Sequence, residues 1–225
     1  MHSGEHAAAG RHLIRSCSGA LYFCAYHSLE EALVGVTIVY ETHSTSTDNE
    51  LGIATGWLPG RLSERGRAEA RELGERRRND SVNVVFTSDL ARAVETTGLA
   101  FAGSGIPIRQ DPRLRECNYG DLNGTSAKDL SARKTYHVDT PFPGGESYRD
   151  VVERTRSLLD DLAQDCDRMR VVLIGHSATK WALDHLLKGQ DLTAAMNGGF
   201  AWQPGWEYAL ESAHEATYDA PPYPR

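Results

Sequence analysis

Thr37-Ile-Val-Tyr-Glu-Thr-His43-Ser-Thr-Ser-Thr-Asp-Asn-Glu50 changes character half-way along its length. It begins with β-branched and aromatic residues and then passes into small hydroxyl residues around one histidine, His43. A buried strand that ends in a loop with a reactive group has this pattern. The stretch therefore predicts a strand that delivers His43 at its carboxyl end.

Two later apolar runs end in the same way. Val82–Phe86 leads into a polar turn that reaches Arg92, and Arg170–Gly175 is followed directly by His176. In an open, mostly parallel sheet, the carboxyl ends of the strands converge on the crevice where ligands bind. We therefore expect His43, Arg92 and His176 to lie in one site.

The remaining apolar runs and turn residues predict helices that alternate with strands. Three serines, Ser63, Ser88 and Ser147, stand where helix N-caps are expected. The expected helices cover Glu64 to Arg78, the residues after Ser88 to about Ala102, Ser147 to about Leu162 and about Ala178 to Leu187, with short strands at Ile106–Arg109 and Gly205–Leu210. This alternation predicts an α/β fold with three layers, a mostly parallel central sheet with helices on both faces.

Composition narrows the classes of protein. The 225 residues suffice for one sizeable domain with extensions, and 40% hydrophobic and 24% charged residues are ordinary for a globular protein. A formal net charge of −7 argues against general nucleic-acid binding. The four cysteines lack metal-site spacing, so we expect free thiols in a reducing, cytoplasmic protein. No apolar run is long enough to span a bilayer.

The chain is expected to divide into three parts. Residues 1–35 are rich in His, Ala and Gly at their start and show no periodicity, so we expect an N-terminal extension that is disordered or not native. Residues 36–215 are the expected domain. Residues 216–225 are expected to form a loose, proline-rich tail.

Six motifs in order resemble those of the histidine phosphatase superfamily, also called the phosphoglycerate-mutase-like family. The resemblance covers roughly Val36 to Leu210. The motifs are Thr42-His43-Ser44 with Asn49 downstream, Leu62–Gly66, Thr87–Ala93, Leu114-Arg115-Glu116 with Tyr119-Gly120, Pro143–Ser147 and Gly175-His176-Ser177. One such motif would be weak evidence, whereas all of them in order favour the fold strongly.

The resemblance implies a phosphomonoester hydrolase that acts on a small phosphorylated metabolite, without metal or other cofactor. It implies that His43 is the nucleophile, that Arg92 and a protonated His176 hold the phosphoryl oxygens, and that Glu116 is the general acid. The neutral or hydroxyl side chains expected to complete the phosphate site are Thr42, Asn49, Ser88 and Ser177.

Thr42 departs from the family pattern, because the family has an arginine beside the nucleophile. A hydrogen bond to a charged group contributes roughly 1.5–3 kcal/mol, so its loss would cost about one to two powers of ten in binding or rate. One hypothesis is compensation by another cation, with Lys180, one turn beyond His176, favoured over Arg65 or Arg115. The other is a changed substrate or a lost activity.

Three other interpretations stay open at this stage. One is a mutase that moves phosphate within a sugar acid, and another is a non-catalytic protein that binds a phosphorylated ligand. The third is a metal site of His43, His176 and Glu116. These residue types can bind a metal, but the resemblance to the phosphatase family argues against such a site. Neither nucleic acid nor a membrane is expected as a partner, and a homodimer stays open.

Overall fold

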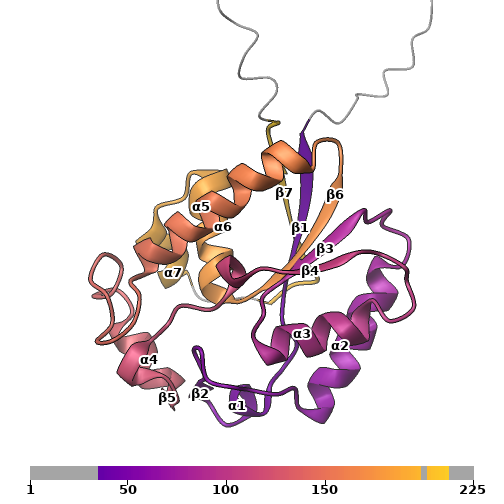
Figure 1. Ribbon diagram of the computed structural model, residues 1–225. Coiled ribbons are helices and arrows are strands. Elements are labelled where there is room, and N and C mark those ends of the chain that lie inside the picture. Colours follow the sequence, from indigo (N-terminus) through magenta and orange to yellow (C-terminus); the bar gives the residue numbers. More distant parts are fainter. Residues whose placement is uncertain (1–34, 199–201, 213–225) are drawn as a thin grey trace, which may run out of the picture. The chain divides into compact units, whose positions relative to one another are not determined.

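A computed structural model describes residues 35–198 and 202–212 (Figure 1). The expected N-terminal extension lies outside the described residues except for Gly35, and so does the expected tail. The proposed division of the chain therefore stays a prediction. Among the helices of the described part, none has the length and apolar character needed to cross a membrane.

The main sheet has five strands in the order β4-β3-β6-β1-β7. These strands are β1 (Val36–Thr42), β3 (Val84–Thr87), β4 (Ile108–Gln110), β6 (Arg170–Gly175) and β7 (Trp206–Leu210). The first four run parallel, and only β7 is antiparallel, to β1. Residue Thr42 is level with Gly175, and Thr87 with Ile174, so β1, β3 and β6 end side by side. This arrangement confirms the predicted convergence of the strand ends.

Helices cover both faces of the sheet (Figure 1). On one face, Ile38 and Tyr40 share a core with residues of α5 (Tyr148–Asp165) and α6 (Ser177–Lys188). On the other, Val39 packs with residues of α2 (Glu64–Arg77) and α3 (Ala91–Ala100). Neighbouring side chains of a strand point to opposite faces, so a strand buried on both sides is apolar throughout. The predicted three-layer α/β fold is confirmed.

Helix α5 follows its predicted pattern. Ser147 and Asp150 form a reciprocal capping box at its start. The residues expected to face the core are all buried: Tyr148, Val151, Val152, Thr155, Leu158, Leu159 and Leu162. Helix α6 ends at Gly189, whose φ of 64° is the left-handed cap expected there.

The prediction that Ser88 caps the following helix was wrong. Leu90 occupies the N-cap position without a side-chain hydrogen bond, and α3 begins at Ala91. The Ser88 hydroxyl accepts a hydrogen bond from the Leu90 N–H and lies 3.0 Å from a ring nitrogen of His176. Its position at the carboxyl end of β3 therefore serves the site rather than the helix.

Several short elements in the connecting loops escaped prediction. These elements are the helices α1 (Thr47–Glu50), α4 (Ala127–Arg133) and α7 (Leu192–Asn197), two 3-10 turns (Pro112–Leu114 and Gly120–Leu122), and a second sheet of β2 (Ile53–Ala54) and β5 (Thr125–Ser126). Each of the three helices buries at most two side chains, which is too few for a periodic pattern.

Two glycines in helices make a matched pair for a stability test. A Cβ on Gly66 of α2 would lie 1.9 Å from the Thr45 carbonyl oxygen, whereas a Cβ on Gly98 of α3 would meet nothing within 4 Å. We expect Gly66→Ala to destabilise the fold by about 1–3 kcal/mol, because it forces α2 away from the loop after His43. Gly98→Ala is expected to stabilise it by about 0.5–1 kcal/mol.

Urea unfolding of the two variants beside the wild type measures both free energies. Equal effects of the two substitutions would contradict the close packing of α2 on this loop.

Candidate active site

His43 follows β1 and is held in one orientation. Its backbone N–H donates to Gly175 O (3.0 Å), and the next N–H, of Ser44, donates to Thr96 Oγ1 (3.0 Å). The ring Nδ1 lies 2.7 Å from Ser44 O. A carbonyl oxygen only accepts, so Nδ1 carries the proton and Nε2 carries the lone pair. The unprotonated ring nitrogen, which faces Arg92, is therefore Nε2.

Arg92 lies between the two histidines and is only 2% exposed. Its Nε is 3.3 Å from His43 Nε2, and its Nη2 donates to Gly56 O (2.9 Å) and to His176 Nδ1 (3.2 Å). Its Nη1 is buried and has no hydrogen-bond partner among the described residues. A buried guanidinium nitrogen without a partner is costly unless a ligand satisfies it.

His176 directly follows the last residue of β6, and its side chain is buried. Arginine can only donate, so the Nδ1 that faces Arg92 accepts, and Nε2–H donates to Ser88 Oγ (3.0 Å). The backbone oxygen of His176 accepts from the Tyr40 hydroxyl (2.5 Å). Its ring centroid lies 4.9 Å from that of His43. The structure thus brings both predicted histidines and Arg92 together.

Both histidines are neutral at pH 7. Burial, followed by the charge of Arg92, lowers the pKa of His43 to about 3. Burial and the same charge hold the pKa of His176 well below its ordinary value. Desolvation and a neighbouring cation both disfavour imidazolium. His43 therefore keeps its lone pair, and Arg92 is the permanent cation in contact with both rings.

Glu116 is buried and lines a cavity together with His43 and Arg92. Its Oε1 accepts from the backbone N–H groups of Cys117 (2.8 Å) and Ala178 (3.2 Å). Burial raises the pKa of this carboxyl group, against the hydrogen bond from Cys117 and the charge of Arg92. Its backbone oxygen accepts from Trp57 Nε1 (2.7 Å) and Arg154 Nη2 (3.1 Å), which fix the loop.

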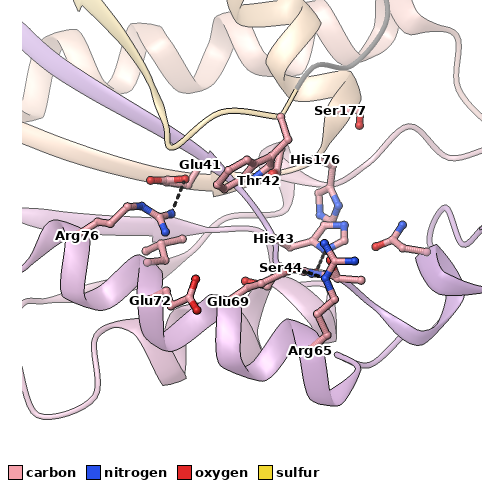
Figure 2. A pocket seen from close by; sticks show the side chains of 14 residues that line it. Glu41, Thr42, His43, Ser44, Arg65, Glu69, Glu72, Arg76, His176 and Ser177 are labelled. Atoms are coloured by element: carbon pink, nitrogen blue, oxygen red, sulfur yellow. Dashed lines mark hydrogen bonds and ion pairs between the residues drawn. The ribbon is translucent and has the colours of Figure 1, made fainter.

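Two cavities lie beside His43, and His43, Asn49 and Ser177 line both of them. The Glu116-side cavity has a volume of about 370 Å³, and its other lining residues include Arg92, Glu116, Lys134, Tyr148 and Trp181. The Thr42-side cavity has a volume of about 550 Å³, and its other lining residues include Thr42, Arg65, Glu69, Glu72, Arg76 and Trp202 (Figure 2).

Of the neutral residues expected at the phosphate, Thr42 lines only the Thr42-side cavity, and Asn49 and Ser177 line both cavities. The Oδ1 atom of Asn49 accepts from the Ser46 N–H (3.0 Å) and hydroxyl (2.9 Å), so only its amide group is free to donate to a ligand. Ser88 lines neither cavity and contacts His176 instead. Ser88 therefore orients the second histidine.

Lys180 lines neither cavity at His43, so the structure does not support its expected role as the compensating cation. Its ammonium pairs with Asp184 one turn along α6 and lies 5.3 Å from the centre of the Trp206 ring. Arg115 is similarly occupied, with its Nε 2.7 Å from Asp89 and its guanidinium over Trp57. Among the three candidates, only Arg65 lines a cavity beside His43.

Sequence reasoning missed the supports of the site. The carbonyl of Gly56 receives Arg92, Trp57 and Arg154 hold the Glu116 backbone, and Thr96 holds the loop of His43. These contacts join residues that are 36 to 59 positions apart in the sequence, so no local pattern signals them. In the described part of the chain, no three or more His, Cys, Asp or Glu side chains are grouped so that they could hold a metal ion.

A family model described as the histidine phosphatase superfamily (branch 1) matches residues 42–201. The chain belongs to this superfamily. The model's match includes both histidines, Arg92 and Glu116, so it spans the whole site described above. The expected family is thereby confirmed.

Similar proteins in this family carry two kinds of name. The 2,3-bisphosphoglycerate-dependent phosphoglycerate mutase of Methylobacterium sp. is 34% identical over 68% of this chain and 80% of its own length. The enzyme of that name from Nitrobacter winogradskyi is 35% identical over 52% of this chain, which spans only 63% of that relative. A mycobacterial glucosyl-3-phosphoglycerate phosphatase solved with VO3 is 25% identical, with a TM-score of 0.66 over 79% of this chain and 99% of its own.

Proposed function

We propose that the protein hydrolyses phosphomonoesters through a phosphohistidine formed on His43. The observation that carries this proposal is Nη1 of buried Arg92, which has no hydrogen-bond partner among the described residues, beside the unprotonated Nε2 of His43, whose contact with Arg92 Nε is long (3.3 Å). A phosphoryl oxygen would satisfy that nitrogen and place phosphorus before Nε2. The solved relative that binds VO3 is named as a phosphatase, which supports the proposal.

In the proposed reaction, His43 Nε2 attacks phosphorus as the ester P–O bond opposite it breaks. Glu116 protonates the departing oxygen, and a new P–N bond holds the phosphoryl group. Glu116 then takes a proton from water, whose oxygen bonds to phosphorus as the P–N bond breaks. Covalent capture thereby divides one difficult displacement into two easier steps.

His176 is neutral in the structure, yet the proposal gives it a role as a second donor. A bound phosphate dianion opposes the effect of Arg92 and raises the pKa of His176. In the proposal, Nδ1 then takes a proton and donates to phosphate in place of accepting from Arg92 Nη2, while Nε2–H keeps its hydrogen bond to Ser88. The amide of Asn49 and the hydroxyl of Ser177 line both cavities at His43 and would add neutral hydrogen bonds.

Glu116→Gln tests the proposed general acid. We expect kcat/KM for an alkyl phosphate to fall by about 10²–10⁴-fold, because an alkoxide needs a proton to leave. With 4-nitrophenyl phosphate, whose phenolate leaves unprotonated, the loss is expected to be less than about tenfold. Steady-state kinetics with both esters measures the difference.

The control for this experiment is Glu153→Gln on the exposed side of α5, where Glu153 pairs with Arg156 (3.6 Å). It should leave both esters unaffected. Equal losses for the two esters in Glu116→Gln would remove the acid role.

The Glu116-side cavity favours hydrolysis over mutase action. Its lining includes three aromatic residues that a leaving group can contact, Tyr119, Tyr148 and Trp181. Besides Arg92, its lysine and arginine residues comprise Lys134 alone. Lys134 already donates to Met196 O and lies 5.3 Å from the Trp181 ring centre. A mutase must hold a substrate with two anionic groups in both orientations, and this lining provides little charge for the second one.

The experiment that tests the proposed function is phosphate release from a panel of esters, in the presence of a chelator. We expect release from small esters with apolar or singly charged leaving groups. Conversion of 3-phosphoglycerate to 2-phosphoglycerate, as the names of the curated relatives suggest, would favour the mutase instead. No release and no isomerisation would leave a protein that only binds a phosphorylated ligand.

A further inference from the structure

The site as described holds too little positive charge for a phosphate dianion. Arg92 is a permanent cation in contact with the histidines, and both rings are neutral before the ligand binds. Position 42 contributes only a hydroxyl group. His176 gains a charge only once phosphate is bound, and Lys134 of the Glu116-side cavity already donates to Met196 O. The other cations that line a cavity at His43 are Arg65 and Arg76 of the Thr42-side cavity.

Arg76 lies at the far end of that cavity and pairs with a buried carboxylate, although its Nε has no hydrogen-bond partner among the described residues. Its guanidinium lies 3.7 Å from the carboxylate of Glu41 and 5.8 Å from the centre of the Trp202 ring. Glu41 is 1% exposed, and Arg77 also donates to it (2.7 and 2.9 Å). Moving Arg76 would weaken the neutralisation of a buried carboxylate, which is costly.

Arg65 lies at the other end of α2, eleven residues or roughly 16 Å of helix from Arg76. Figure 2 shows Arg65 and Glu69 on the stretch of helix beside His43, and Arg76 beside Glu41. The Nε of Arg65 donates to Glu69 Oε1 (2.7 Å). The structure gives its two Nη nitrogens no protein partner among the described residues, so the outer fork of the guanidinium is free to bind an anion.

The backbone around Arg65 fixes its distance from the nucleophile. Ser63 N–H donates to Thr45 O (3.0 Å), and Thr45 N–H donates to Glu69 Oε2 (3.0 Å). Gly66 packs so closely on Thr45 that no side chain fits between them. A chain of contacts thus runs from the loop of His43 through Glu69 to the guanidinium of Arg65.

We propose that Arg65 is the second phosphate-binding cation and takes the place of the arginine missing at position 42. Its outer nitrogens bind an oxygen of the phosphate held at His43, and Glu69 orients the guanidinium through Nε. The pair with Glu69 is exposed on the arginine side, where the side chain is 73% accessible, so little is lost when it adjusts. This inference rests on the phosphate-binding part of the proposed function.

The test uses orthovanadate and inorganic phosphate as probes and measures binding by calorimetry. Arg65→Ala is expected to raise both dissociation constants, and KM for an ester, by about 10- to 100-fold. Arg65→Lys should recover part of the loss, because it restores charge without the fork. Arg71→Ala, an exposed arginine of the same helix, is the control and should change binding by less than about twofold.

A second variant separates a binding role from a structural one. Adding Thr42→Arg to Arg65→Ala is expected to tighten orthovanadate binding by about tenfold or more relative to Arg65→Ala alone. The melting temperature of Arg65→Ala should match the wild type.

The proposal would be overturned by three results: no binding of either probe to the wild type, dissociation constants in Arg65→Ala within about twofold of the wild type, or an equal change in Arg71→Ala. Binding that depends on Arg65 without release of phosphate from any ester would contradict the proposed hydrolysis alone.

Discussion

Replacing His43 by alanine is expected to lower the rate of phosphate release by about 10³-fold or more, to background. The reason is that, in the proposed mechanism, Nε2 is the atom that bonds to phosphorus, and neither ring nitrogen of His176 can take its place. The lone pair of the His176 Nδ1 faces Arg92, and its Nε2–H is directed at Ser88. The measurement is steady-state phosphate release at saturating substrate.

The matched control is His185→Ala. His185 lies on α6, where its Nδ1 is 2.7 Å from Gln190 O, and it lines neither cavity. We expect this variant to keep the wild-type rate. Activity of His43→Ala within about tenfold of the wild type would exclude His43 as the nucleophile.

Replacing Arg92 by alanine is expected to lower kcat/KM by about 10²–10³-fold. The buried guanidinium touches His43, Gly56 and His176 at once and has one more nitrogen to offer a phosphoryl oxygen. Arg92→Lys should recover little, because an ammonium group cannot make these contacts together.

A second readout distinguishes this role from simple loss of structure. The charge of Arg92 is one cause of the low pKa of His43, so the pKa of His43 should rise in Arg92→Ala. Histidine NMR titration measures this change. The control is Arg156→Ala on the outer side of α5, where the pair with Glu153 is exposed, and it should change neither quantity. An unchanged kcat/KM in Arg92→Ala would contradict the proposed phosphate site.

The sequence predicted the frame of the site well, because that frame depends on local patterns. An apolar run followed by His43 or by His176 signals a strand and its carboxyl end, and parallel strands place such ends together. The helix after Ser147 was equally clear, since its capping box and apolar spacing are both local.

Local patterns could not predict which partner a single side chain contacts, and hence which role it has. Lys180 stands one turn after His176, yet its ammonium turns to Asp184 and the Trp206 ring of a strand that lies far along the chain. Ser88 has the sequence features of a helix cap, but its neighbour in space is His176. Tertiary contacts decided both cases, and no local pattern records such contacts.

Arg65 illustrates the reverse case. In the sequence it is one of several arginines on a highly charged helix, where most side chains face solvent. Its place beside His43 depends on how closely Gly66 approaches Thr45, which is a property of the packed structure. The sequence could name Arg65 only as one of three candidates for the missing cation, with Lys180 favoured, whereas the geometry singles it out.

The most direct test of the central claim is to trap the covalent intermediate. The wild type is mixed with a phosphate ester, quenched with denaturant at alkaline pH, and digested for mass spectrometry. We predict one phosphoryl group, labile to acid and stable to alkali, on the His43 ring in the peptide that contains it. Ester hydrolysis without any phosphoryl group on His43, at times when turnover is under way and in a variant slowed at Glu116, would contradict the mechanism.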